Sequence, residues 1–131
     1  MGDAESELML IFPLKYRRQL HRRAYKAQQS GHREVCGVFS LHNNKIKLHF
    51  LKNLTSKPYK WEICESELKG KAGTFHSHPI GDTALSDGDL RDTKTNELML
   101  IYDVCGREAK LWKITGKKPS LVQEFNSGFY F

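Results

Sequence analysis

Thr-Phe-His-Ser-His-Pro, residues 74–79, is the stretch that decides the predicted fold and chemistry of this chain. Residues 72–75 are uncharged and predict a strand, in which residues i and i+2 point to the same face, so the rings of His76 and His78 should lie side by side. Pro79 has no N–H for a strand ladder, and we expect the strand to end there.

Downstream of this strand, residues 80–85 include a glycine and an aspartate and predict a loop. Ser86 and Asp89 form a Ser-x-x-Asp start of a helix, which places the Asp89 carboxylate in the first helical turn. Together with His76 and His78 it makes a set of three ligands with a fourth position open, as in catalytic zinc sites. Water at such a position has its pKa lowered to about 7, so the pattern predicts a metal-dependent hydrolase.

Glu34 is the best candidate for accepting a proton from that water. It begins the run Glu-Val-Cys-Gly-Val-Phe-Ser, which is apolar and β-branched and predicts a core strand over 34–41. A carboxylate that enters a core strand is costly unless something pairs with it, which indicates a functional role.

In this order and spacing, Glu34, His76, His78, Ser86 and Asp89 resemble the JAMM motif of the JAB/MPN/Mov34 metalloproteases. The resemblance implies that the two histidines and Asp89 bind one zinc ion per chain. It also implies that Glu34 is the general acid and base, and that Ser86 stabilises the tetrahedral intermediate.

The resemblance further implies an α+β fold, α/β/α-like, with a mixed β-sheet flanked by helices, as in JAB/MPN (cytidine-deaminase-like) domains. The expected function is a zinc peptidase or isopeptidase that cuts after the C-terminal glycine tail of a ubiquitin-like or sulfur-carrier protein. Enzymes of the E1-like and E2-like kinds, including those of anti-phage operons, are expected partners. The alternatives are a non-catalytic MPN-type scaffold and a nucleic-acid-associated JAB domain of the DNA-repair type, although nucleic acid is not the expected partner.

Length and composition fit one domain over residues 1–131, with 39% hydrophobic residues. No stretch approaches the roughly 20 apolar residues of a membrane span, and the start lacks a signal-peptide pattern, so a cytoplasmic protein is expected. Cys36, Cys64 and Cys105 form no Cys-x-x-Cys pair and are expected to be reduced and mostly buried. Cys36 is also two residues beyond Glu34, so in a regular strand it would face the site.

The net charge of +6 is partly concentrated in a predicted helix over 14–29, which Pro13 opens. At 100° per residue, one face carries Tyr16, Leu20, Ala24 and Ala27, and the opposite face carries Lys15, Arg18, Arg22 and Lys26. The basic face is either a solvated helix surface or a docking stripe for an acidic protein or a phosphate backbone.

Further strands are predicted from alternation and β-branched content. The first two should form a hairpin around residues 42–44. The expected strands are 8–12 at an edge, 34–41, 45–51, 59–64, 72–75, 98–104 and 110–115.

Two serines leave alternatives open. Ser86 could cap a helix, donate to an oxyanion or do both. A serine triad built on Ser77 or Ser86 lacks a glycine-rich nucleophile elbow. The remaining histidines lack ligand spacing and are expected at the surface; they are His21, His32, His42 and His49.

Overall fold

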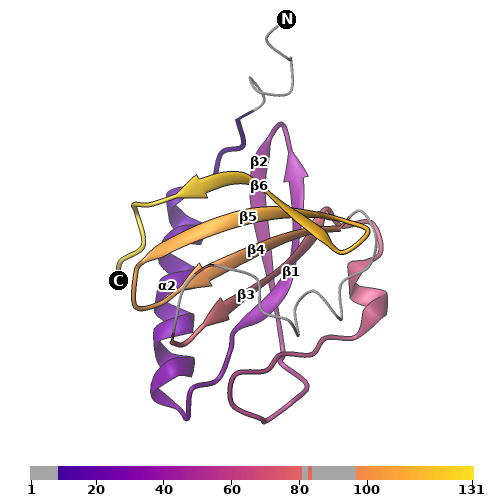
Figure 1. The fold of residues 1–131 in the computed structure, drawn as a ribbon. Coiled ribbons are helices and arrows are strands. Elements are labelled where there is room, and N and C mark those ends of the chain that lie inside the picture. The colour runs from indigo at the N-terminus through magenta and orange to yellow at the C-terminus, as the bar shows by residue number, and fades with distance from the viewer. Residues whose placement is uncertain (1–8, 81–82, 84–96) are drawn as a thin grey trace, which may run out of the picture.

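The computed structural model describes residues 9–80, 83 and 97–131. Within these ranges the chain forms one α-helix, one short 3₁₀ helix and a six-stranded sheet (Figure 1). The elements are α2 (Leu14–Gln29), β1 (Cys36–His42), β2 (Lys45–Leu51), η1 (Glu65–Leu68), β3 (Gly73–His78), β4 (Glu97–Asp103), β5 (Glu108–Thr115) and β6 (Lys118–Phe125).

The sheet is mixed, with the strand order β2-β1-β3-β4-β5-β6. All neighbouring strands are antiparallel except β3 and β4, which are parallel. The predicted mixed sheet and the β1–β2 hairpin are therefore confirmed. Because β3 pairs on both sides, His76 lies in register between Cys36 of β1 and Ile101 of β4.

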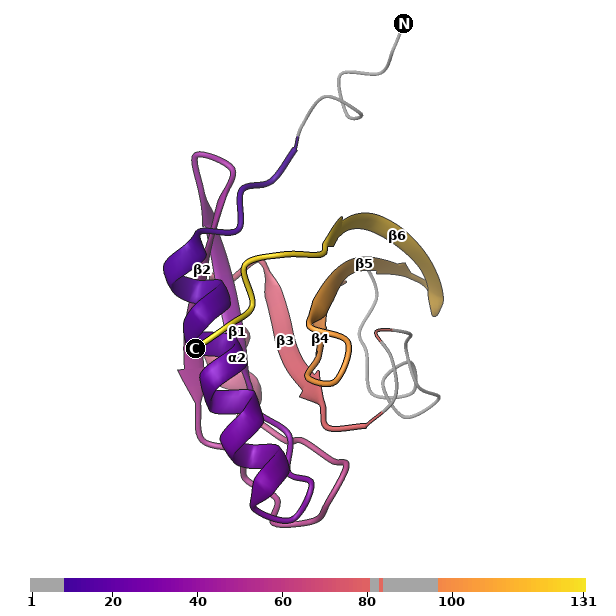
Figure 2. The ribbon, with the colours of Figure 1, turned by 90° about the vertical axis from the view of Figure 1, so that its left-hand side faces the viewer.

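Helix α2 has the predicted bounds and the predicted inward face. Leu20 and Ala24 are buried, whereas Lys15 and Arg22 are exposed. The Pro13 carbonyl accepts hydrogen bonds from the N–H groups of residues 16 and 17, which closes the first turn. Figure 2 shows the helix on one side of the curved sheet.

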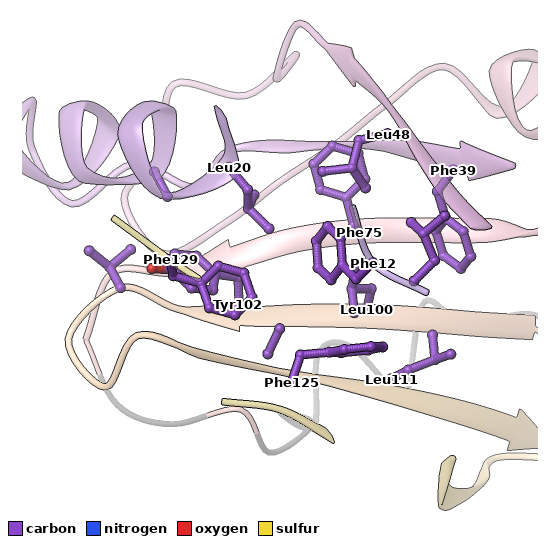
Figure 3. Packing of buried hydrophobic residues seen from close by; sticks show 14 residues of the cluster. Phe12, Leu20, Phe39, Leu48, Phe75, Leu100, Tyr102, Leu111, Phe125 and Phe129 are labelled. Atoms are coloured by element: carbon purple, nitrogen blue, oxygen red, sulfur yellow. The ribbon is translucent and has the colours of Figure 1, made fainter. Parts of the chain in front are cut away.

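Two hydrophobic clusters follow the alternation of side chains along the strands. The larger one joins α2 to the sheet face that carries Phe39, Phe75 and Leu100 (Figure 3). The smaller one lies on the opposite face and contains Met99, Ile101 and Ile114, with Trp61 and Trp112 packed against it. His76 and His78 belong to this second face, because they alternate with Phe75.

Two strand predictions were wrong. Residues 59–64 form no strand, because the Asn53 side chain bonds the Lys60 carbonyl and the Glu62 N–H in place of a neighbouring strand. Strand β6 was missed, since it is mostly exposed at the sheet edge and contains Pro119.

The flanking layers are described in part. Helix α2 covers one face of the sheet, and the helix expected to begin at Ser86 lies outside the described residues. Of the expected edge strand over 8–12, the described part contributes a single bridge from Ile11 to Lys45. Residue 8 lies outside the described residues.

The observed burial of three side chains differs from the prediction. His21 is buried rather than exposed, because it lies on the same inward arc of α2 as Leu20 and Ala24. Cys64 and Cys105 are exposed, and only Cys36 is buried. All three cysteines are free, as expected.

Candidate metal centre

Strand β3 brings the two histidines of the Thr-Phe-His-Ser-His-Pro stretch together as predicted. Their Nε2 atoms lie 3.1 Å apart, and their ring centroids are 5.0 Å apart at an interplanar angle of 52°. Two neutral imidazole nitrogens facing each other at this distance either share a hydrogen or direct two lone pairs toward one cation.

The donor set fits zinc. With Zn–N bonds of about 2.0–2.1 Å and tetrahedral angles, two histidine nitrogens should lie about 3.3 Å apart. The observed Nε2–Nε2 distance of 3.1 Å is close to this value, so one ion could accept both nitrogens with little movement of either ring.

His76 is held on three sides. It pairs in register with Cys36 and Ile101, and the Trp61 ring stacks on it with centroids 4.9 Å apart and an interplanar angle of 16°. Its side chain is fully buried, whereas that of His78 is partly exposed. The pair therefore consists of one enclosed histidine and one partly exposed histidine.

Glu34 lies two residues before the start of β1 and is 7% exposed. Its backbone carbonyl accepts a hydrogen bond of 3.0 Å from the Asn53 side chain, which joins this end of the strand to the 53–62 loop. Because Glu34 is two residues before Cys36, the partner of His76, its backbone lies at the end of β1 that is next to the histidine pair.

The Cys36 thiol reports on this local environment. Burial is the main cause that raises its pKa to about 12, and the negative charge of Glu34 raises it further. A hydrogen bond from the Glu62 backbone acts in the opposite direction. The negative charge of Glu34 thus acts together with burial to disfavour the Cys36 thiolate.

Ser77 lies on the other face of β3. Its hydroxyl accepts a hydrogen bond of 2.9 Å from the Val35 N–H, and its own N–H donates to the Val35 carbonyl over 2.9 Å. The Ser77 version of a serine triad is therefore wrong, because the hydroxyl faces away from both histidines. Its role is to extend the pairing of β1 and β3 toward Glu34.

Ser86 and Asp89, the other two predicted site residues, lie outside the described residues. Across residues 9–80, 83 and 97–131, no group of three or more His, Cys, Asp or Glu side chains could hold a metal ion. The described part of the site thus consists of the two histidine nitrogens with Glu34 beside them.

The sequence analysis missed two residues that contribute to the site. Trp61 comes from a segment predicted as a strand, and its stacking on His76 results from the path of the 53–64 loop. Asn53 fixes that path, since its side-chain Oδ1 accepts hydrogen bonds from the backbone N–H groups of Thr55 and Glu62. Asparagine is typical of such loop-bracing bonds, which is the only hint that the sequence offered.

Comparison with solved structures finds the same fold in two proteins of low sequence identity. A solution structure of a protein from Desulfitobacterium hafniense has a TM-score of 0.70 at 19% identity, covering 86% of this chain and 89% of that one. A structure described as JAMM, a metalloprotease-like zinc site in the proteasome and signalosome, has a TM-score of 0.50 at 20% identity. That match covers 88% of this chain and 93% of the other.

At a coarse level the chain thus shares its fold with these two structures. No family model matches the sequence, and no curated protein matches it. Among the described helices, none is both long and apolar enough to cross a lipid bilayer.

Proposed function

We propose that this chain is a cytoplasmic zinc-dependent peptidase of the JAB/MPN type, which hydrolyses the bond after the C-terminal glycine tail of a ubiquitin-like or sulfur-carrier protein. The observation that carries the proposal is the 3.1 Å approach of the His76 and His78 Nε2 atoms on a strand next to Glu34. The fold shared with a JAMM zinc-site protein and the JAMM-like order of residues in the sequence support it.

In this proposal His76, His78 and Asp89 hold the metal. An ion there would supply Lewis-acid chemistry, which polarises a scissile carbonyl and lowers the pKa of an attacking water. Glu34 takes a proton from that water and passes it to the leaving amine. Ser86 donates a hydrogen bond to the developing oxyanion.

Burial suits Glu34 for this task. Water reaches little of its side chain, so a proton held there is kept from bulk solvent between its uptake and its delivery. The glutamate is not needed as a ligand in this scheme, because the three other side chains complete the open tetrahedral set.

Metal analysis is the first test. Protein purified without chelator should contain close to one zinc per chain, and His78→Ala should lose it because two protein ligands hold zinc poorly. His42→Ala, at an exposed hairpin position, is the matched control and should keep the metal. Zinc that is absent and is not taken up on addition would overturn the metal site.

Substrate class needs its own test. A ubiquitin-like protein fused through its glycine tail to a folded reporter should be cut after the last glycine, and valine in place of that glycine should abolish most of the cleavage. Changes in the reporter should matter far less. Cleavage by the zinc-containing chain that does not depend on the glycine would support the peptidase activity and contradict the ubiquitin-like substrate.

A further inference from the structure

A cavity of about 370 Å³ opens beside Glu34, where β1 begins and β2 ends. Glu34 and Cys36 form its buried end, and Phe50 and Val35 contribute apolar wall. The cavity is therefore lined in part by Glu34, the residue that we propose as the proton carrier.

Positive charge surrounds this cavity. Four of its lining residues carry cations, against the single carboxylate of Glu34. They come from α2, from the turn before β1 and from the segment after β2, and all four are exposed; they are Arg23, Lys26, Arg33 and Lys52. Within the described part of the chain, none of the four takes part in an ion pair.

One of these cations has a fixed position. The Arg23 guanidinium lies over the Phe50 ring, 4.3 Å from its centroid, which holds the charge against the wall of the cavity. The apolar wall can contact the backbone and methylene groups of a peptide. The cationic rim can contact its carboxylates.

We propose that this cavity binds an acidic segment of the polypeptide substrate, so that Asp or Glu side chains near the cut bond contact the cationic rim. The inference rests on the proposed function, and it adds a preference for acidic sequence beside the scissile bond. The charge complementarity of four cations around one cavity selects this occupant.

A nucleic acid fits the same charges less well. Single strands bind along extended basic grooves with open aromatic faces on which bases stack. Here the cations surround one cavity, and the face of its Phe50 ring is covered by Arg23. The aromatic surface of the cavity is thus already used, and the carboxylate of a peptide remains the better match.

The experiment measures binding without requiring hydrolysis. Three dye-labelled probes are titrated with the full chain: a peptide rich in glutamate and glycine, the same peptide with glutamine in place of glutamate, and an oligothymidine of the same length. The test variant is K26E/K52E, and the control is K15E/R22E. The control removes the same charge from exposed residues of α2 that do not line the cavity.

The glutamate peptide should bind more tightly than the glutamine peptide, and K26E/K52E should weaken it about tenfold or more. K15E/R22E should weaken it less than about twofold, because the charges it removes lie outside the cavity. Equal losses in both double variants would reduce the effect to net charge and overturn the site. Tighter binding of the oligothymidine would overturn it in favour of a nucleic-acid partner.

The results distinguish a failure of the acidic-segment site from a failure of the proposed peptidase function. A chain that holds zinc and cuts a glycine tail while binding both peptides equally would remove the acidic-segment site alone. A chain without zinc or turnover that still binds the glutamate peptide through Lys26 and Lys52 would remove the peptidase and leave an acidic-peptide binding site. Thermal unfolding of each variant checks that the fold is retained.

Discussion

At the residue scale, the two histidines of β3 differ in how deeply they are buried. His76 is enclosed by Trp61, Cys36 and Ile101, whereas His78 is partly exposed at the strand end. In metal sites, loss of a neighbour that fixes the ring of a ligand typically costs about 10- to 100-fold in metal affinity. In the proposed site, Trp61 would fix the His76 ring in this way through its stacking contact.

Replacing Glu34 separates the chemistry from metal binding. Glu34→Gln keeps the size and burial of the side chain but cannot take a proton, so turnover should fall about 10²- to 10⁴-fold while zinc content stays unchanged. Single-turnover cleavage and metal analysis on the same preparation would measure both. Loss of zinc from the glutamine variant would mean that Glu34 is a ligand instead.

His21 gives the fold a pH dependence of its own. Its Nδ1 lies 2.6 Å from the Tyr102 hydroxyl in the core, and burial first, then the positive charge of Arg107, lowers its pKa below 6.5. Its ring also contacts Tyr25 and Phe131. The folded chain therefore keeps His21 neutral where the unfolded chain would protonate it.

Since the unfolded state then binds more protons, the free energy of unfolding should fall as pH drops from about 6.5 through the lower pKa of the folded state. Above pH about 6.5 the contribution is fully present. Urea titrations of wild type and His21→Gln should show a steeper loss on acidification in the wild type. His42→Gln, which changes an exposed histidine, should behave like the wild type.

At the element scale, β1 can approach its neighbours because one residue lacks a side chain. A β-carbon on Gly37 would lie 2.2 Å from the His49 carbonyl oxygen and 2.6 Å from the Phe75 ring. Gly37 thus allows β1 to pair closely with β2 while Phe75 packs beneath it. This packing positions the start of β1, and with it Glu34.

Gly37→Ala should therefore force the strands or the Phe75 ring to shift, and should lower the free energy of unfolding by about 3 kcal/mol, the upper end of typical overpacking costs. Gly70→Ala is the comparison, since nothing lies within 4 Å there and only its φ of 77° disfavours the change. That variant should cost about 1 kcal/mol. Equal effects of the two substitutions in urea titrations would contradict close packing at Gly37.

At the scale of the whole molecule, metal binding and folding should be linked, because the proposed ligands exist as a pair only when β3 is folded. A bound metal at 100 times its dissociation constant stabilises the native state by about 2.7 kcal/mol. Chelator should therefore lower the melting temperature of the wild type by several degrees, and should leave His78→Ala unaffected. Equal melting with and without chelator, in protein shown to carry zinc, would contradict the linkage.

Much of this architecture was predictable from local patterns. The 100° periodicity of α2 and the alternation of β2 identify their inward faces, since one side of each is more apolar than the other. The alternation of β3 places His76 and His78 on one face. Patterns failed where long-range contacts decide the structure: Asn53 keeps 59–64 from pairing, and the edge strand β6 has little apolar alternation. Trp61 and the basic cavity likewise depend on loops that meet only in the folded chain.

The pairing of β3 with a strand on each side also affects how the chain would bind metal again after losing it. His76 can leave its place only if a central strand separates from both β1 and β4, so the nitrogen pair should persist through cycles of metal loss. Reloading would then be a simple capture step whose rate depends on metal concentration. A chain that has lost its metal when the metal is scarce would therefore bind it again without refolding.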